Sequence, residues 1–91
     1  MEKEVLQLIG KNIRHFRTLK GFSQQELEFS AKINNNYLTD IEKGSRDIKI
    51  STLCKIANAL NVDIYELLIK RDNYESKKRI DNKVNGEINS K

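Results

Sequence analysis

Three consecutive asparagines, Asn34 to Asn36, form a run whose side chains can take part in specific hydrogen bonding. An asparagine carboxamide donates and accepts hydrogen bonds at once, a pattern that matches the N6 and N7 edge of adenine. Asparagine is also favoured at the start of a helix and disfavoured inside it. Capping accounts for Asn34, but it does not account for Asn35 and Asn36. We interpret these two as candidate base contacts, with a solvent-exposed face as the alternative.

The residues that follow the asparagines have the spacing of a helix with one buried face. Leu38 and Ile41 are three positions apart and must both face a core. The polar side chains around them therefore point outward, and Tyr37 lies at the edge of the buried face. The candidate base-contacting residues are Asn35, Asn36, Tyr37, Thr39 and Asp40.

Residue types that catalysis or metal binding would need are scarce. The sequence has one histidine and one cysteine, so it offers neither a cluster of metal ligands nor a nucleophile paired with a base. We expect no enzyme activity, no metal site and no cofactor. Cys54 is predicted to be a small core residue, because unpaired cysteines are commonly buried.

The net charge of the sequence is only a weak indication of what the protein binds. The net charge is +4, but residues 1–69 contain ten basic and nine acidic residues, whereas residues 70–91 contain seven and four. The positive excess is therefore in the C-terminal segment, and nucleic-acid binding has to be argued from geometry. No apolar run is long enough to span a bilayer, and the N-terminus does not look like a signal peptide. We expect a cytoplasmic protein without a membrane partner.

Helices must position the candidate residues, because apolar residues recur at helical spacing and nothing alternates with the period of a strand. The sequence predicts an all-α fold of five helices: residues 4–19, 24–31, Asn34 to about Lys43, a fourth from Ser51 and a fifth from Asp63. Ser23 and Glu26 are spaced as a capping box. The other expected caps are Asn34, Ser51, and Asp63 with Glu66. Glycines placed to end helices are Gly21 and Gly44.

Two of the predicted helices are short and are joined by a tight turn from Ala31 to Asn34. Such a pair is a helix-turn-helix unit, whose first helix crosses the phosphate backbone while the second enters the major groove. We interpret residues 1–69 as a DNA-binding and dimerisation domain. Residues 70–91 are interpreted as a polar basic tail, either disordered or a short helical extension.

The segment SQQELEFSAKINNNYLTDIEKG, residues 23–44, resembles the phage-repressor and Cro-like helix-turn-helix family, also called the XRE family. The segment KISTLCKIANALNVDIYELL resembles the fourth and fifth helices of that family. GSRDIKISTLCKIANAL also resembles the controller proteins of restriction-modification systems. The resemblance implies a five-helix bundle of the lambda-repressor-like type that binds operator DNA, usually as a dimer on a palindrome.

The resemblance also implies roles for individual residues. DNA phosphate contacts are expected from Ser23, Gln24, Lys43, Arg46 and Lys49, with ordinary solubility as the alternative for each lysine. Arg17 and Glu42 resemble a buried ion pair that ties the first helix to the third.

Two residues depart from the family pattern. Glu28 stands where a small residue usually lets the two helices of the unit approach each other. Lys32 stands where the turn usually has glycine, and a left-handed backbone at another residue costs about 1 kcal/mol. Both departures predict a slightly altered angle between these helices.

We therefore expect a sequence-specific bacterial or phage transcription regulator, for example a repressor, that binds a palindromic operator as a homodimer. The dimer interface is predicted at Tyr65, Leu68 and Ile69, because the last helix has more apolar surface than one small core can bury. The alternative is that the tail folds back over this surface. The alternative function is an antitoxin-type module that autoregulates its own operon and binds a protein partner through the tail.

Overall fold

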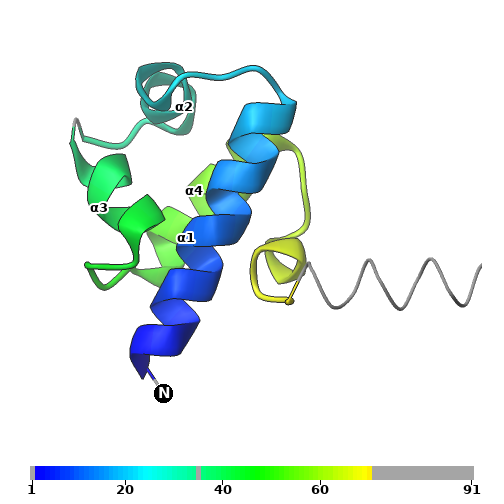
Figure 1. Ribbon diagram of the computed structural model, residues 1–91. Helices are drawn as coiled ribbons and strands as arrows, with labels where there is room; N and C mark the ends of the chain where they lie inside the picture. Colours follow the sequence, from blue (N-terminus) through cyan, green and yellow to red (C-terminus); the bar gives the residue numbers. More distant parts are fainter. Residues whose placement is uncertain (1, 35, 71–91) are drawn as a thin grey trace, which may run out of the picture.

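The computed structural model describes residues 2–34 and 36–70, and within them the protein is helical and contains no strand (Figure 1). The elements are α1 (Glu2–Leu19), α2 (Gln24–Ala31), α3 (Tyr37–Lys43), α4 (Ile50–Leu60) and a short 3-10 helix, η1 (Ile64–Leu67). The prediction of an all-α protein is confirmed for these residues. No helix among them is both long enough and apolar enough to cross a membrane. Apart from Lys70, the predicted tail lies outside the described residues.

The first helix, α1, is the central element. It packs against α3, α4 and η1, and α3 and η1 lie on opposite sides of it (Figure 1). Ile9, Asn12 and Ile13 form its buried face, at the spacing of one helical stripe. Gly10 is buried beside the end of α3, where a Cβ atom would lie 2.7 Å from the backbone oxygen of Glu42. Only glycine lets the two helices approach this closely.

The second helix begins as its sequence predicts. The Glu26 amide donates to Ser23 Oγ over 3.0 Å, and the Ser23 amide donates to Glu26 Oε1 over 2.7 Å. This is a complete capping box. The helix ends at Lys32, whose backbone is left-handed with φ 60°. Lys32 therefore adopts the conformation for which the family uses glycine.

The third helix begins later than predicted. It starts at Tyr37, and its N-cap residue is Asn36, which has a left-handed backbone and makes no side-chain capping hydrogen bond. The prediction that Asn34 caps the helix is wrong. Instead the Leu38 amide, in the first turn of α3, donates to Glu28 Oε2 over 3.2 Å. A carboxylate from α2 thus takes the place of a local cap. The helix ends at Gly44, which is left-handed as predicted.

Two predictions about α4 are wrong. Ser51 is not its cap, because the helix begins at Ile50 after Lys49, whose extended backbone precedes the first turn without a side-chain cap. Cys54 is exposed rather than buried. The buried face of α4 contains Leu53, Ile56, Ala57 and Leu60, and position 54 is rotated about 100° from position 53, away from the centre of that face.

The expected fifth helix is only the four-residue turn η1, so the five-helix prediction is wrong in detail. Asp63 precedes it as predicted, but its side chain makes no capping hydrogen bond. The buried side chain of Asn12 holds this turn, because its amide donates to the carbonyl oxygens of Leu67 over 3.0 Å and Ile69 over 2.8 Å. A helix that continued past η1 would use these carbonyls for its own amides.

One apolar core joins all five elements. Its buried residues are Ile9, Ile13, Leu27, Ala31, Leu38, Ile41, Leu53, Ile56, Ala57, Leu60 and Leu67. Leu27 and Leu38 anchor α2 and α3, and α2 also packs against α4. The outward faces of α2 and α3 are therefore presented by helices that the core holds in place.

Candidate nucleic-acid interface

The turn between α2 and α3 spans residues 32–36, one residue more than the predicted turn from Ala31 to Asn34, and it ends two residues later. Its two ends are left-handed, at Lys32 with φ 60° and Asn36 with φ 68°. Asn36 therefore precedes α3 and does not lie on it, and asparagine is one of the few residues that tolerate this conformation. The backbone thus explains the residue type at position 36 without any base contact. Asn35 lies outside the described residues.

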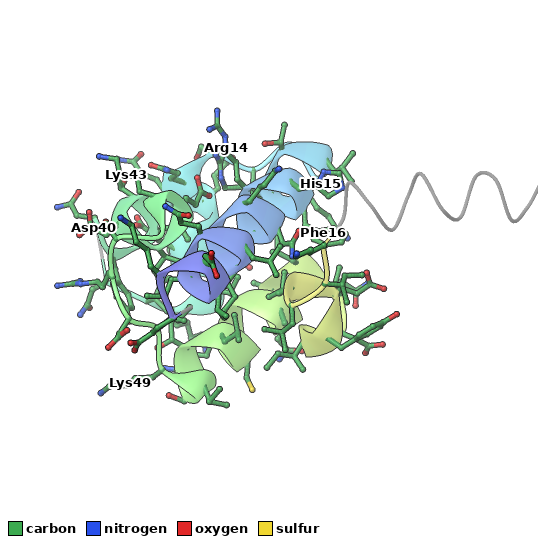
Figure 2. All side chains as sticks on the ribbon, turned by 60° about the horizontal axis from the view of Figure 1, so that its bottom comes forward. Arg14, His15, Phe16, Asp40, Lys43 and Lys49 are labelled. Carbon is green, nitrogen blue, oxygen red and sulfur yellow. The ribbon has the colours of Figure 1, made fainter. Side chains whose placement is uncertain are left out.

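The outward side of α3 carries the other predicted base contacts. Tyr37, Thr39 and Asp40 are partly buried, whereas Lys43 is exposed. Figure 2 shows the side chains of Asp40, Lys43 and Lys49 pointing outward on the side of the molecule that α3 forms. One face of the protein thus combines hydrogen-bonding side chains with cations.

A chain of polar contacts fixes this face to α1 and α2. Arg17 Nε donates to Glu42 Oε2 over 2.6 Å, and Arg17 Nη2 donates to Glu42 Oε1 over 3.2 Å. Gln24 Nε2 donates to the same Glu42 Oε1 over 3.0 Å, and the Thr39 hydroxyl donates to Gln24 Oε1 over 3.0 Å. The pair that the resemblance implied, Arg17 and Glu42, is thus one part of a network that reaches the outward side of α3.

The network engages residues that were predicted to bind phosphate. Among the described residues, Gln24 uses its carbonyl oxygen and one N–H group, so its other N–H group can bond to a ligand. The Ser23 hydroxyl accepts the capping hydrogen bond from α2 and is exposed. These two side chains lie at the N-terminus of α2, where backbone amides favour an anion.

A second group of contacts links the start of α3 to the loop that follows it. The Arg46 guanidinium lies over the ring of Tyr37, 4.9 Å from its centroid. The Tyr37 hydroxyl donates to the backbone oxygen of Asp47 over 3.5 Å. Stacking on an aromatic ring orients an arginine while leaving its N–H groups available at the ring edge. Arg46 is exposed and is held beside α3.

An open groove runs between the start of α3 and α4. Its lining residues are Lys32, Ile33, Asn34, Tyr37, Arg46, Asp47, Lys49, Thr52 and Lys55. Four of these are cationic and one is acidic, so the groove favours an anion. Arg46 and Lys49 were predicted to contact phosphate, whereas no such role was predicted for Lys32 and Lys55. The positions of these two lysines in the sequence give no signal by themselves, because lysine is common on any solvated face.

Two buried polar residues that position the site were not predicted to do so. Glu28 was predicted only to alter the angle between the two helices, as a departure from the family pattern, and no role was predicted for Asn12. Both are almost fully buried and bond to the backbone of another element: Glu28 to the Leu38 amide, and Asn12 to the carbonyl oxygens of Leu67 and Ile69. Polar residues at positions where the helical pattern requires apolar ones were the available signal.

The predicted dimer residues lie away from this face. Tyr65 and Leu68 remain 52% and 45% exposed, and Ile69 is half-buried. They belong to η1 and the residues directly after it, on the opposite side of α1 from α3 (Figure 1). Leu67, between them, is fully buried in the core.

Residues 13–67 match the helix-turn-helix family HTH_3. Two similar sequences are an uncharacterized HTH-type transcriptional regulator, y4dJ, of Sinorhizobium fredii and the control protein C.BamHI of Bacillus amyloliquefaciens. Each is 33% identical over 69 residues; the matches cover 76% and 75% of this chain and 90% and 85% of the relatives.

Solved structures support the same assignment. The restriction-modification controller protein C.AhdI from Aeromonas hydrophila is similar with a TM-score of 0.66 and 34% identity, over 68% of this chain and 94% of that one. A hypothetical transcription factor from Neisseria is similar with a TM-score of 0.76 and 30% identity, over 84% and 87%. The chain belongs to the HTH_3 helix-turn-helix family, the XRE family of bacterial and phage transcription regulators.

Proposed function

We propose that this protein is a transcription regulator that binds a palindromic operator as a homodimer. The observation that carries the proposal is the outward side of α3, which is bordered by the cationic groove and tied to α1 and α2 by the Arg17–Glu42–Gln24–Thr39 network. Because this network holds the helix in one orientation, its side chains are preorganised for a groove.

In this proposal, α3 enters the major groove and reads base edges. The reading residues are Asn35, Asn36, Tyr37, Thr39 and Asp40. Phosphate contacts come from the N-terminus of α2, from the end of α3 and from the loop after it, through Ser23, Gln24, Lys43, Arg46 and Lys49. The groove composition adds Lys32 and Lys55 to the phosphate contacts. Base contacts then determine sequence preference, and phosphate contacts determine most of the salt dependence.

The dimer follows from the amount of contact that one helix can make. One recognition helix in one groove gives too small an interface for the tight binding typical of specific regulators. Two copies related by a twofold axis reach successive major grooves about 34 Å apart. The surface formed by Tyr65, Leu68 and Ile69 suits the contact between copies, since it is apolar and lies across α1 from α3.

The relatives favour a regulator over the alternative function. Among the similar proteins are control proteins, one of them a controller of a restriction-modification system, and several HTH-type transcriptional regulators. None of the relatives reported above is described as an antitoxin, and most of the tail on which that alternative depends lies outside the described residues.

The test of the proposed function is selection of binding sites from random duplex DNA, followed by footprinting. We expect a palindromic site with half-sites one helical turn apart, about 10 base pairs from centre to centre. Enrichment of no sequence, or protection of a single half-site, contradicts the proposal.

Two variants test its parts. Asn36→Gly removes the side chain but permits the left-handed backbone, so it tests base reading without adding strain. It is expected to weaken specific binding by about tenfold and to leave binding to random DNA unchanged. Leu68→Arg places a charge in the proposed interface and is expected to give monomers by sedimentation at concentrations where the wild type dimerises. Equal losses on both DNAs remove Asn36 from the reading set, and a persistent dimer rejects the interface.

A further inference from the structure

The first turn of α3 lacks the local cap that helices of this length normally need. A helix leaves the amides of its first turn without partners inside the helix. The residue that should supply a capping oxygen, Asn36, is left-handed and its side chain makes no capping bond. The amide of Leu38 instead donates to Glu28 Oε2 over 3.2 Å. The start of the helix therefore depends on a side chain from α2.

Glu28 contacts both ends of the turn. Its backbone oxygen accepts hydrogen bonds from the amides of Lys32 and Ile33, which close α2. Its side-chain oxygen accepts the bond from Leu38, which opens α3. Glu28 thus joins the last turn of α2 to the first turn of α3, and the length of its side chain sets the distance between these two turns.

Because Glu28 is buried, its side chain needs this hydrogen bond. The residue is 4% exposed, and a buried carboxylate requires a hydrogen-bond partner. Within residues 2–34 and 36–70, the Leu38 amide is the partner that the structure gives to this carboxylate. Rotation or translation of α3 relative to α2 would break the bond and leave both groups unpaired. The contact therefore favours one orientation of α3 over its neighbours.

We propose that Glu28 is a positioning residue that sets DNA sequence discrimination by holding α3 in one orientation, without touching DNA. Thr39 and Asp40 lie one turn or less after the Leu38 amide, so a small rotation at that point moves them across the groove. The inference rests on the proposed DNA-binding function. It adds that the orientation of the reading surface depends on a buried carboxyl group within the α2–α3 unit.

Two variants of matched size separate the hydrogen bond from the volume of the side chain. Glu28→Gln keeps the length of the side chain and an acceptor oxygen, whereas Glu28→Met keeps a similar volume and has no comparable acceptor. The ratio of affinities for the selected site and for random DNA is measured for both. We expect glutamine to keep the wild-type ratio within about twofold and methionine to lower it by about tenfold, the size of one lost hydrogen bond.

A core variant controls for general loss of stability. Ile56→Val, in the fully buried face of α4, weakens packing away from the turn and is expected to leave the ratio unchanged. All binding is measured well below each variant's Tm. Hydrogen exchange of the Leu38 amide gives a readout that needs no DNA: it is expected to be slow in the wild type and the glutamine variant, and at least tenfold faster in the methionine variant.

These outcomes separate the inference from the function on which it rests. If the wild type shows no sequence preference, the proposed function fails, whatever the exchange data show. If the wild type discriminates and the methionine variant keeps its ratio, Glu28 does not position α3 for reading. Unchanged exchange at Leu38 in the methionine variant also overturns the inference.

Discussion

Removal of Arg17 tests how far the polar network holds the fold together. The Arg17 and Glu42 side chains are 15% and 6% exposed, and two N–H groups of the guanidinium bond to the carboxylate. A third N–H, on Nη1, donates to the backbone oxygen of Phe22 over 2.8 Å. Arg17→Met would leave the Glu42 carboxylate nearly buried, with only Gln24 donating to it among these contacts.

The magnitude follows from this burial. Removing one partner of a buried ion pair costs about 3 to 5 kcal/mol, whereas an exposed pair contributes at most about 1 kcal/mol. The partial exposure of Arg17 and the remaining bond from Gln24 place the expected loss near the lower end, at about 3 kcal/mol. A domain of about 70 residues has a total free energy of unfolding of about 4 to 10 kcal/mol. The single variant is therefore expected to retain about 1 to 7 kcal/mol of this stability.

Urea denaturation followed by circular dichroism measures this loss. Arg17→Met is expected to lower the midpoint by about 2 to 3 M, if the slope is close to 1 kcal/mol per M as in small domains. The double variant Arg17→Met/Glu42→Leu removes both charges and is expected to recover to within about 1 kcal/mol of the wild type. The exposed Lys20→Met serves as a control and should change stability by less than about 0.5 kcal/mol. A loss below about 1 kcal/mol for Arg17→Met alone would refute this reasoning, because it would show that the Arg17–Glu42 pair contributes no more stability than an exposed ion pair.

Four further predictions concern single residues. Gly10→Ala forces a Cβ against backbone atoms of α3 and should cost about 1 to 3 kcal/mol in thermal denaturation; an unchanged Tm would show that α1 and α3 can separate at no cost. Lys32→Gly should stabilise the protein by up to about 1 kcal/mol, because it relieves the left-handed backbone, and a lower Tm would contradict this. Asn12→Leu removes the hydrogen bonds to the carbonyl oxygens of Leu67 and Ile69, and it should lower the free energy of unfolding by about 1 to 3 kcal/mol and weaken dimerisation in sedimentation. An intact dimer would show that Asn12 does not support the dimer interface. Arg46→Ala should weaken binding to all DNA and lower the salt slope by about one unit, whereas an unchanged slope would exclude a phosphate contact.

The parts of the fold that the sequence predicted correctly are determined by local contacts. The start of α2 was predicted to the residue because both halves of its capping box lie within four consecutive positions. Gly21 and Gly44 were predicted to close α1 and α3, and both are left-handed. In each case the residues that determine the element are within or next to it.

Two of the wrong predictions, the start of α3 and the length of the last helix, concern elements that are determined from a distance. Asn34 looked like a cap because capping is usually local, but α3 begins three residues later and takes its cap from Glu28. The last helix looked complete in sequence, yet Asn12, more than fifty residues earlier, bonds to the carbonyls at the end of η1. Glu28 lies in a different helix from the amide that it caps, and Asn12 is 55 residues from Leu67, so neither contact can be read from the pattern of one helix. Sequence patterns therefore predicted which helices exist better than where two of them begin and end.

The same distinction applies to the candidate site. Residue types and spacing placed Thr39 and Asp40 on the outward side of α3, since two apolar neighbours define the inner side. They could not show that Thr39 bonds to Gln24, or that Gln24 bonds to Glu42, because these contacts join α2 and α3 only after folding.

The contacts that cross between helices have a common arrangement. Glu28 joins α2 to the start of α3, the Arg17–Glu42 pair joins α1 to the end of α3, and Asn12 joins α1 to the surface after η1. Each of these contacts joins an element beside the proposed DNA-reading face or the proposed dimer surface to another helix of the domain. Each needs a defined geometry, because the groups that bond are largely buried. Since α1 takes part in two of them, the reading face and the proposed dimer surface are fixed to the same rigid helix. In a dimer joined at that surface, the distance between the two copies of α3 is thus set mainly by α1, and a palindrome of one fixed spacing is the site such a dimer would select.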